Sequence, residues 1–225
     1  VTGWRKSIGP ALQRVKAKYP VTQAPAIRLD RHEAEQHMAI AHALGHANGM
    51  PEPYCACDQS FRLPTNGKRR IGLADTANPR PEWDRKRWPY YRELATKLLR
   101  AGHEVFAFGD ANDAARYKER GWPDGVRSLQ GQLSLLETAA ALKQVDVLVA
   151  NDCGLAHMAG ALATPVVCLW GPTSLIKGSP LGAEVTNLSL ELSCAPCHLS
   201  ADWQRCQTPA CLEDRKSTRL NSSHY

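Results

Sequence analysis

The sequence predicts an α/β protein built on a mostly parallel sheet. Two short runs, Val145–Ala150 and Pro165–Trp170, are continuous and apolar, as expected of strands that are buried on both faces. Small residues dominate Leu155–Leu162, which lies between them, and predict a helix that packs closely on the sheet. From Lys68 onward, apolar runs alternate with helical patterns, and this alternation indicates βαβ crossovers.

The first third of the chain is less regular. Ile8–Lys18 is expected to form a short helix, and Arg31–Leu44 a better one with apolar residues gathered on one face. Gly45–Asn66 is rich in Gly, Pro and Asn and is expected to be a loop.

The elements of the sheet domain follow in order. Strands are expected at Arg70–Ala74, His103–Phe108, Val145–Ala150, Pro165–Trp170 and, as an edge strand, Val185–Leu192. A polar, proline-broken loop is expected at Asp75–Trp83, and helices at Trp88–Ala101, Ala111–Arg120, Leu133–Lys143 and Leu155–Leu162. Pro89 suits a first helical turn and Gly102 a helix end. Ser134 and Glu137 have the spacing of a capping box.

Composition limits the classes of function. Hydrophobic residues at 43% and charged residues at 22% are typical of a globular protein, and no apolar run approaches the roughly 18 to 20 residues that span a membrane. The net charge of +6 suits phosphorylated ligands or an anionic membrane surface. Nucleic acid is not expected as a partner, because the basic residues are scattered and no nucleic-acid motif is present.

The polar corner Asn151–Gly154 is the strongest candidate site. It joins the end of an apolar strand to a helix start, where free N–H groups and the helix dipole favour a phosphate. Asp152 would reach into the crevice at the strand's end, and His157 would add a hydrogen bond or a charge from the first helical turn. The alternative is that Asp152 only caps the helix and His157 only packs on the sheet.

The segment D-C-G-L-A-H-M-A-G-A-L-A-T-P-V-V-C-L-W-G-P-T, which begins at Asp152, resembles glycosyltransferase family 9, the lipopolysaccharide heptosyltransferases. The resemblance extends over about residues 68–212 and implies the Rossmann-like C-terminal domain of a two-domain GT-B glycosyltransferase, with the N-terminal domain largely missing. It implies that Asp152, Cys153, Gly154 and His157 bind a nucleotide-sugar donor. Cys153 departs from the family, which usually has Ser or Thr at this position.

Further donor contacts are implied by the same resemblance. Lys86 stands in K-R-W-P, where the family's K-x-W-P lysine reaches the donor phosphates; the alternative is a solvated lysine in a basic loop. Asp113 stands close to the family's ribose-binding acid, with Asp110 as a rival and a helix cap as the alternative. The stretch Gly131–Leu136 resembles the family's G-x-x-[ST]-L and would border the donor site, or be only a turn and a cap.

Four of the eight cysteines form a separate cluster. Cys194, Cys197, Cys206 and Cys211 have the spacing C-x2-C-x8-C-x4-C, and four thiolates at this density suit a structural Zn²⁺. Loop thiols without metal and disulfides are the alternatives. No cofactor is expected for catalysis itself.

The expected reaction moves a sugar, foremost a heptose from ADP-heptose, to a lipopolysaccharide core or related glycan acceptor with inversion. The resemblance places the general base on an aspartate of the N-terminal domain, so this chain is expected to bind donor without turnover. It also implies a cytoplasmic enzyme with peripheral association at the inner face of the inner membrane. A non-catalytic nucleotide-sugar-binding module, a zinc-stabilised interaction domain and a nucleotide-sugar epimerase are the alternatives.

Three regions are therefore expected. Residues 1–63 would be the tail of the acceptor domain with a linker, and residues 64–213 the donor-binding domain. Residues 214–225 are expected to be foreign, because Asp214–His224 equals the translation of a widely used sequencing adapter. The start at Val1, which is not a methionine, leads us to expect that the true N-terminus is missing.

Overall fold

The computed structural model describes residues 28, 30–182, 184–200, 202–206 and 209–213. The predicted helix at Ile8–Lys18 and the residues 214–225 lie outside this part of the chain. Contacts divide the protein into two units, one comprising Val1–Glu52 with Ile176–Gly178 and the other Pro53–Leu175 with Ser179–Tyr225. None of the described helices is long and apolar enough to cross a membrane.

The first unit contains helix α1, Glu33–Ala43, within the range expected from the sequence. Its start is fixed by His32, whose ring accepts the Ala34 N–H at 3.1 Å, and by the favourable placement of Glu33 and Glu35 at the positive end of the helix dipole. Between α1 and the first strand, residues 45–69 form no helix or strand, as their Gly and Pro content predicts.

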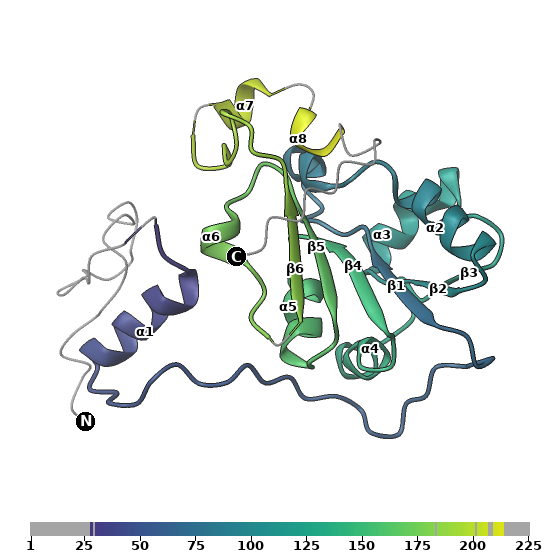
Figure 1. Ribbon diagram of the computed structural model, residues 1–225, viewed down its shortest axis with the longest axis horizontal. Helices are drawn as coiled ribbons and strands as arrows, with labels where there is room; N and C mark the ends of the chain where they lie inside the picture. Colours follow the sequence, from purple (N-terminus) through teal and green to yellow (C-terminus); the bar gives the residue numbers. More distant parts are fainter. Residues whose placement is uncertain (1–27, 29, 183, 201, 207–208, 214–225) are drawn as a thin grey trace. The chain divides into compact units, whose positions relative to one another are not determined.

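The second unit is a six-stranded sheet in which every neighbouring pair is parallel (Figure 1). The strands lie in the order β3-β2-β1-β4-β5-β6. Their bounds are Arg70–Ala74 (β1), Glu104–Ala107 (β2), Val126–Ser128 (β3), Val147–Asn151 (β4), Val166–Trp170 (β5) and Val185–Ser189 (β6). The mostly parallel sheet and the edge strand are confirmed, whereas β3 was not expected.

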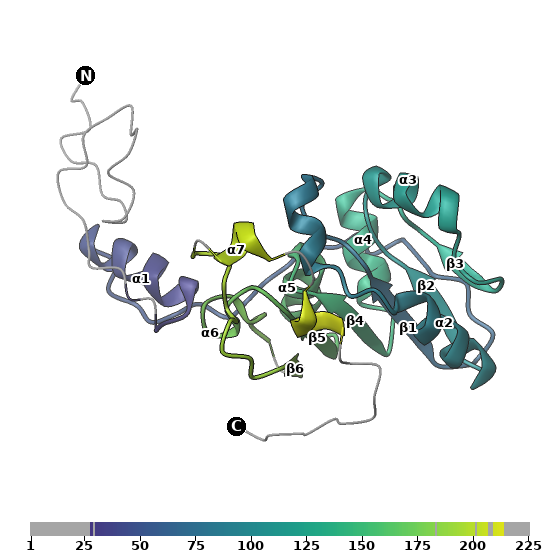
Figure 2. The same ribbon diagram turned by 90° about the horizontal axis from the view of Figure 1, so that it is seen from above.

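Alternate residues of each strand pack on opposite faces of this sheet. In β4, Leu148 and Ala150 belong to one hydrophobic cluster, while Val147 and Val149 contact the other. Helices α4 and α5 cover the first face and α2 covers the second (Figure 2). A strand that must bury both faces needs a continuous apolar run, which explains why the strands were visible in the sequence.

Helices connect the strands, and two short helices follow the last strand. They are a 3-10 helix at Pro81–Lys86 (η1), α2 Tyr91–Arg100, α3 Ala111–Arg120, α4 Leu135–Leu142, α5 Gly154–Ala161, α6 Leu175–Gly178, α7 Asp202–Arg205 and α8 Ala210–Glu213. The predicted capping box of Ser134 and Glu137 is confirmed at the start of α4. Our expected start of α2 at Trp88 was wrong, because the ring of Pro89 disfavours helical geometry at the residue before it.

The strand order creates a switch point in the sheet. From β1 the chain proceeds outward through β2 and β3, and then returns to the other side of β1 to form β4, β5 and β6. The connections after β1 and β4 therefore diverge, and the region between them at the carboxyl ends of these two strands is called the crevice below. Ligands of open α/β sheets bind at such a crevice.

Candidate functional site

Polar side chains gather at this crevice. Asp75 directly follows β1 and is only 6% exposed, and Asn151 ends β4 and is completely buried. Asp152 follows at once, with 16% of its side chain exposed. The ends of β1 and β4 thus carry two carboxylates and an amide at the switch point of the sheet.

Lys86 joins this group from the end of η1. Its Nζ lies 2.7 Å from Asp152 Oδ2, and the lysine side chain is 14% exposed. The same ammonium stands over the Trp83 ring, 5.4 Å from its centre. His157 Nε2 lies 4.0 Å from the other Asp152 oxygen. The structure therefore brings together three of the residues that the sequence analysis selected.

Helix α5 begins beside this ion pair. Its N-cap is Cys153, which has extended backbone geometry and whose carbonyl accepts the Ala156 N–H at 3.1 Å. The alternative that Asp152 caps this helix was wrong, because Asp152 lies one residue too early and pairs with Lys86. Burial raises the pKa of Cys153 to about 11, so its thiol stays neutral at physiological pH.

Gly154, the first residue of α5, faces open space. A Cβ built at this position would meet no heavy atom within 4 Å. Protein packing therefore does not require a glycine here, whereas the close approach of a ligand to the backbone amides would.

Asp113 does not line the crevice. Its side chain is 1% exposed; one oxygen accepts the Asp110 N–H at 3.0 Å and the other lies 2.9 Å from Arg87. Asp110 in turn accepts the Asn112 and Asp113 N–H groups, which completes a capping box. The alternative that these residues form a helix cap is confirmed. Our expectation that Asp113 offers an oxygen to a ribose is corrected, because its carboxylate is buried. Asp110 is the exposed acid of the pair.

The stretch Gly131–Leu136 forms a turn followed by the cap of α4. The Gly131 N–H donates to the Gly109 carbonyl at 3.1 Å, so this turn lies against the loop that precedes α3. Gly131 has a φ of +66°, a conformation that favours glycine. A turn and a helix cap therefore explain the conformation of residues 131–136 without any ligand.

A buried polar network lies beneath the ion pair, and the sequence analysis missed it. Asp75 accepts the Tyr117 hydroxyl at 2.6 Å and lies 3.7 Å from Arg87. Burial raises the pKa of Asp75 despite these partners. Burial also raises the pKa of Tyr117. The only signal in the sequence was adjacency, since Arg87 follows Lys86 and Asn151 precedes Asp152.

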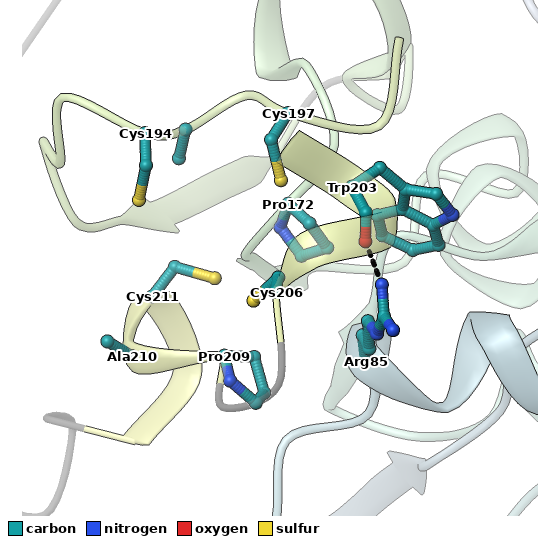
Figure 3. Close-up of a pocket in the computed structure, with 10 residues that line it drawn as sticks. Arg85, Pro172, Cys194, Cys197, Trp203, Cys206, Pro209, Ala210 and Cys211 are labelled. Carbon is teal, nitrogen blue, oxygen red and sulfur yellow. Dashed lines mark hydrogen bonds between the residues drawn. The ribbon is translucent and has the colours of Figure 1, made fainter. Parts of the chain in front are cut away.

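The four clustered cysteines face one small cavity of about 50 Å³ (Figure 3). These are Cys194, Cys197, Cys206 and Cys211, and none of the four forms a disulfide. Their chemistry suits Zn²⁺, but within the described residues no group of three or more His, Cys, Asp or Glu side chains is arranged to hold a metal ion. Zinc binding therefore stays a prediction.

This cysteine-rich segment, residues 194–211, contacts the segment that carries Lys86. The Arg85 guanidinium donates a hydrogen bond to the Trp203 carbonyl and stands 5.3 Å from the centre of the Trp203 ring. The Trp83 and Trp203 rings lie 5.2 Å apart. The aromatic surface under Lys86 is thus continuous with the cysteine cavity.

A parallel sheet in the order 3-2-1-4-5-6, with polar groups at its switch point, defines a Rossmann-like domain. Comparison with known proteins gives the family. The model of glycosyltransferase family 9 (heptosyltransferase) matches residues 3–206, and the chain belongs to this family.

Named relatives agree with this assignment. The chain is 36% identical over 183 residues to lipopolysaccharide heptosyltransferase 2 of Escherichia coli K12, covering 69% of this chain and 50% of that protein. It is 36% identical over 116 residues to the Salmonella typhimurium protein of the same name, covering 47% and 32%. The chain therefore spans half or less of the length of these relatives.

Solved structures share the fold. The structure of E. coli ADP-heptose lps heptosyltransferase II matches with a TM-score of 0.62 and 25% identity, covering 76% of this chain and 58% of that one. E. coli heptosyltransferase WaaC with ADP matches with a TM-score of 0.53 and 24% identity, covering 82% and 58%. The fold is thus that of GT-B heptosyltransferases, as expected from the sequence.

Proposed function

We propose that this chain is the donor-binding part of an enzyme that transfers a heptose from ADP-heptose to a lipopolysaccharide core or related glycan, with inversion at the anomeric carbon. One observation carries the proposal. Lys86 and Asp152 pair at the switch point of the sheet, beside the start of a helix whose first residue leaves open space for a ligand. The named relatives support the choice of sugar and nucleotide.

Each group has a distinct task in this proposal. The backbone amides at Cys153 and Gly154, with the dipole of α5, hold the diphosphate. Lys86 and His157 offset the negative charge that develops on the diphosphate as the glycosidic bond breaks. Asp152 accepts hydrogen bonds from sugar hydroxyls once Lys86 has turned to the phosphates.

The acceptor half of the enzyme completes the reaction. We propose that an aspartate in that half is the general base for the acceptor hydroxyl, so the present chain binds donor without turnover. We further propose that no cofactor takes part in the transfer. The proposed site of action is the cytoplasmic face of the inner membrane, where the enzyme associates peripherally with the surface that carries its acceptor.

Isothermal titration of the chain with ADP, UDP and GDP tests the proposal. We expect selective ADP binding, and a loss of at least about tenfold in affinity for Lys86→Ala, since a lysine at a diphosphate makes charge-assisted hydrogen bonds. Lys97→Ala is the matched control, because Lys97 is exposed on α2. Selective binding of UDP or GDP would mean that the donor carries that nucleotide instead of ADP. Absence of binding by the folded chain would contradict the proposed donor site.

Transfer itself is measured with the complete two-domain enzyme, ADP-heptose and a lipopolysaccharide acceptor. Transfer with inversion supports the proposal. A protein that binds ADP and yet transfers no sugar in its complete form would instead be a non-catalytic binding module.

A further inference from the structure

The segment that carries Lys86 is held by side chains that have no place in the proposed chemistry. Lys86 is the last residue of a 3-10 helix, and lysine has a flexible four-carbon stem. Its position opposite Asp152 therefore depends on how the backbone on either side of it is fixed.

Arg87, the next residue in the chain, fixes the backbone directly after Lys86. Its side chain is 6% exposed, and its guanidinium makes three sets of contacts. It donates to the carbonyls of Asp75 and Ala77 in the loop after β1, pairs with Asp113 of α3 at 2.9 Å, and donates to Asp84 of η1 at 3.2 Å. One buried cation thus ties the Lys86 segment to two other elements of the crevice wall.

Asn151 fixes the chain one residue further on, at Trp88. Its Oδ1 accepts the Trp88 N–H at 3.1 Å and the Tyr91 hydroxyl at 3.2 Å. Its Nδ2 donates to the Thr76 carbonyl at 3.3 Å and to Asp75 Oδ1 at 3.4 Å. All four partners lie in the loop after β1 or just after Lys86, so the residue next to Asp152 holds the backbone that presents Lys86.

We infer that Asn151 and Arg87 are positioning residues for the proposed donor site, which hold Lys86 so that its ammonium faces the end of β4. They act through Lys86 and touch neither donor nor reacting atoms. The inference rests on the proposed function for its effect on nucleotide binding, but the placement of Lys86 can be measured without any nucleotide.

The first test is a double-mutant cycle of Asn151→Ala with Lys86→Ala, read by ADP titration. A residue that acts through Lys86 should lower ADP affinity about tenfold when Lys86 is present, the size expected for losing one bond of a buried network, and change it less than about twofold when Lys86 is absent. Gln144→Ala is the matched control. Gln144 also bridges main-chain groups, because it accepts from the Leu63 N–H and donates to the Phe61 carbonyl. It precedes β4 and so lies at the amino end of this strand, whereas Asn151 lies at its carboxyl end.

The second test is the rate at which an amine-reactive acetylating reagent labels Lys86, followed by mass spectrometry. Lys86 is shielded and ion-paired, so labelling should be slow, and Asn151→Ala should accelerate it several-fold while Lys97 is unaffected. Arg87→Lys keeps the buried charge but loses the planar fork of donors, and it should change both measurements in the same direction. It serves as the second variant if Asn151→Ala does not fold.

The outcomes are separable. Absence of ADP binding in the unsubstituted chain would overturn the proposed function, and Lys86 labelling would still decide the inference. Unchanged labelling of Lys86 in folded Asn151→Ala and Arg87→Lys would overturn the inference. Equal loss of ADP affinity with and without Lys86 would do the same, since it would show a general structural role.

Discussion

Lys86 Nζ lies 2.7 Å from Asp152 Oδ2, so the cation proposed for the donor phosphates is already paired with the acid proposed for the donor sugar. A diphosphate must replace the carboxylate as the partner of this ammonium. The two residues therefore oppose each other in nucleotide binding, although both are proposed to serve the donor.

Asp152→Asn should raise the affinity for ADP by about fivefold, because it removes both a competitor for Lys86 and a negative charge beside the phosphates. The advantage of ADP-heptose over ADP should shrink in the same variant, since the amide is a weaker acceptor for sugar hydroxyls. Titration of both ligands into both proteins checks this. Weaker ADP binding by a folded Asp152→Asn would contradict the competition.

Two glycines of α5 should respond in opposite ways to alanine. At Gly160 a Cβ would lie 2.5 Å from the Leu181 carbonyl oxygen, so Gly160→Ala should lower the free energy of unfolding by about 1 to 2 kcal/mol, the helix-propensity gain being smaller than the cost of the clash. Gly154→Ala meets no clash, so it should raise the free energy of unfolding slightly through helix propensity, but it should weaken ADP binding because its methyl group fills the open space. Urea unfolding and titration measure the two effects. Equal stability of both variants would refute the packing argument.

The buried carboxyl of Asp75 should lower the free energy of unfolding as the pH rises, which is the reverse of the usual effect of an aspartate. Its pKa is raised in the folded chain by burial, so the folded state holds this proton more tightly than the unfolded state. Its stabilising contribution is complete below about pH 4 and is lost as the pH rises through the folded pKa. In urea unfolding, the stability of the unsubstituted chain relative to Asp75→Asn should therefore fall as the pH rises above about 4.

Asp58 provides a control of opposite sign for that experiment. Hydrogen bonds from the Ser60 side chain and N–H lower the pKa of Asp58. Its contribution is present above the ordinary pKa and is lost as the pH falls. Relative to Asp58→Asn, the unsubstituted chain should gain stability as the pH rises from acid, and the same slope in both comparisons would contradict the assignment of the two shifts.

The cysteines should differ widely in reactivity. Burial raises the pKa of both Cys211 and Cys153 to about 11, so at pH 8 these thiols are protonated and iodoacetamide should label them slowly. Cys194 is exposed and should be labelled first within its cluster. Peptide mapping over time checks the order, and guanidinium chloride should abolish it. Labelling of Cys211 as fast as Cys194 in the folded chain would contradict it.

Zinc binding by the cysteine cluster is tested separately by elemental analysis of the reduced chain and of Cys197→Ser. A zinc site would give about one equivalent of tightly held metal that the variant loses. Cys55→Ser is the control, because Cys55 lies outside the cluster. Equal metal content in all three proteins would remove the prediction.

The sequence predicted those parts of the fold that local chemistry determines. Ser134 and Glu137 are three residues apart and cap α4 as expected, and the buried strands showed as apolar runs. Strand β3 was missed because it has only three residues, none of them buried. The helix after Pro89 was placed too early, although the sequence carried the signal, because a proline disfavours helical geometry at the residue before it.

In the candidate site, too, the features that depend on local sequence were predicted, and those that depend on contacts between distant residues were not. The corner at Asp152 was recognised from the order strand, polar turn and helix, whereas the partner of its carboxylate was not, because Lys86 is far away in the sequence. Asp113 shows the reverse error. Its position after a strand suggested an exposed acid, but a buried Arg87 that sequence spacing does not reveal has turned it inward.

The ion pair of Lys86 and Asp152 also bears on discrimination among anions. A free phosphate offers a partner to the lysine but none to the aspartate, so it would break the pair and leave a partly buried carboxylate without its closest cation. A ligand that carries a diphosphate at one end and hydroxyl groups at the other replaces both halves of the pair at once. In the proposed donor site, we therefore expect this internal neutralisation to favour such bifunctional ligands over the simple anions of the cell.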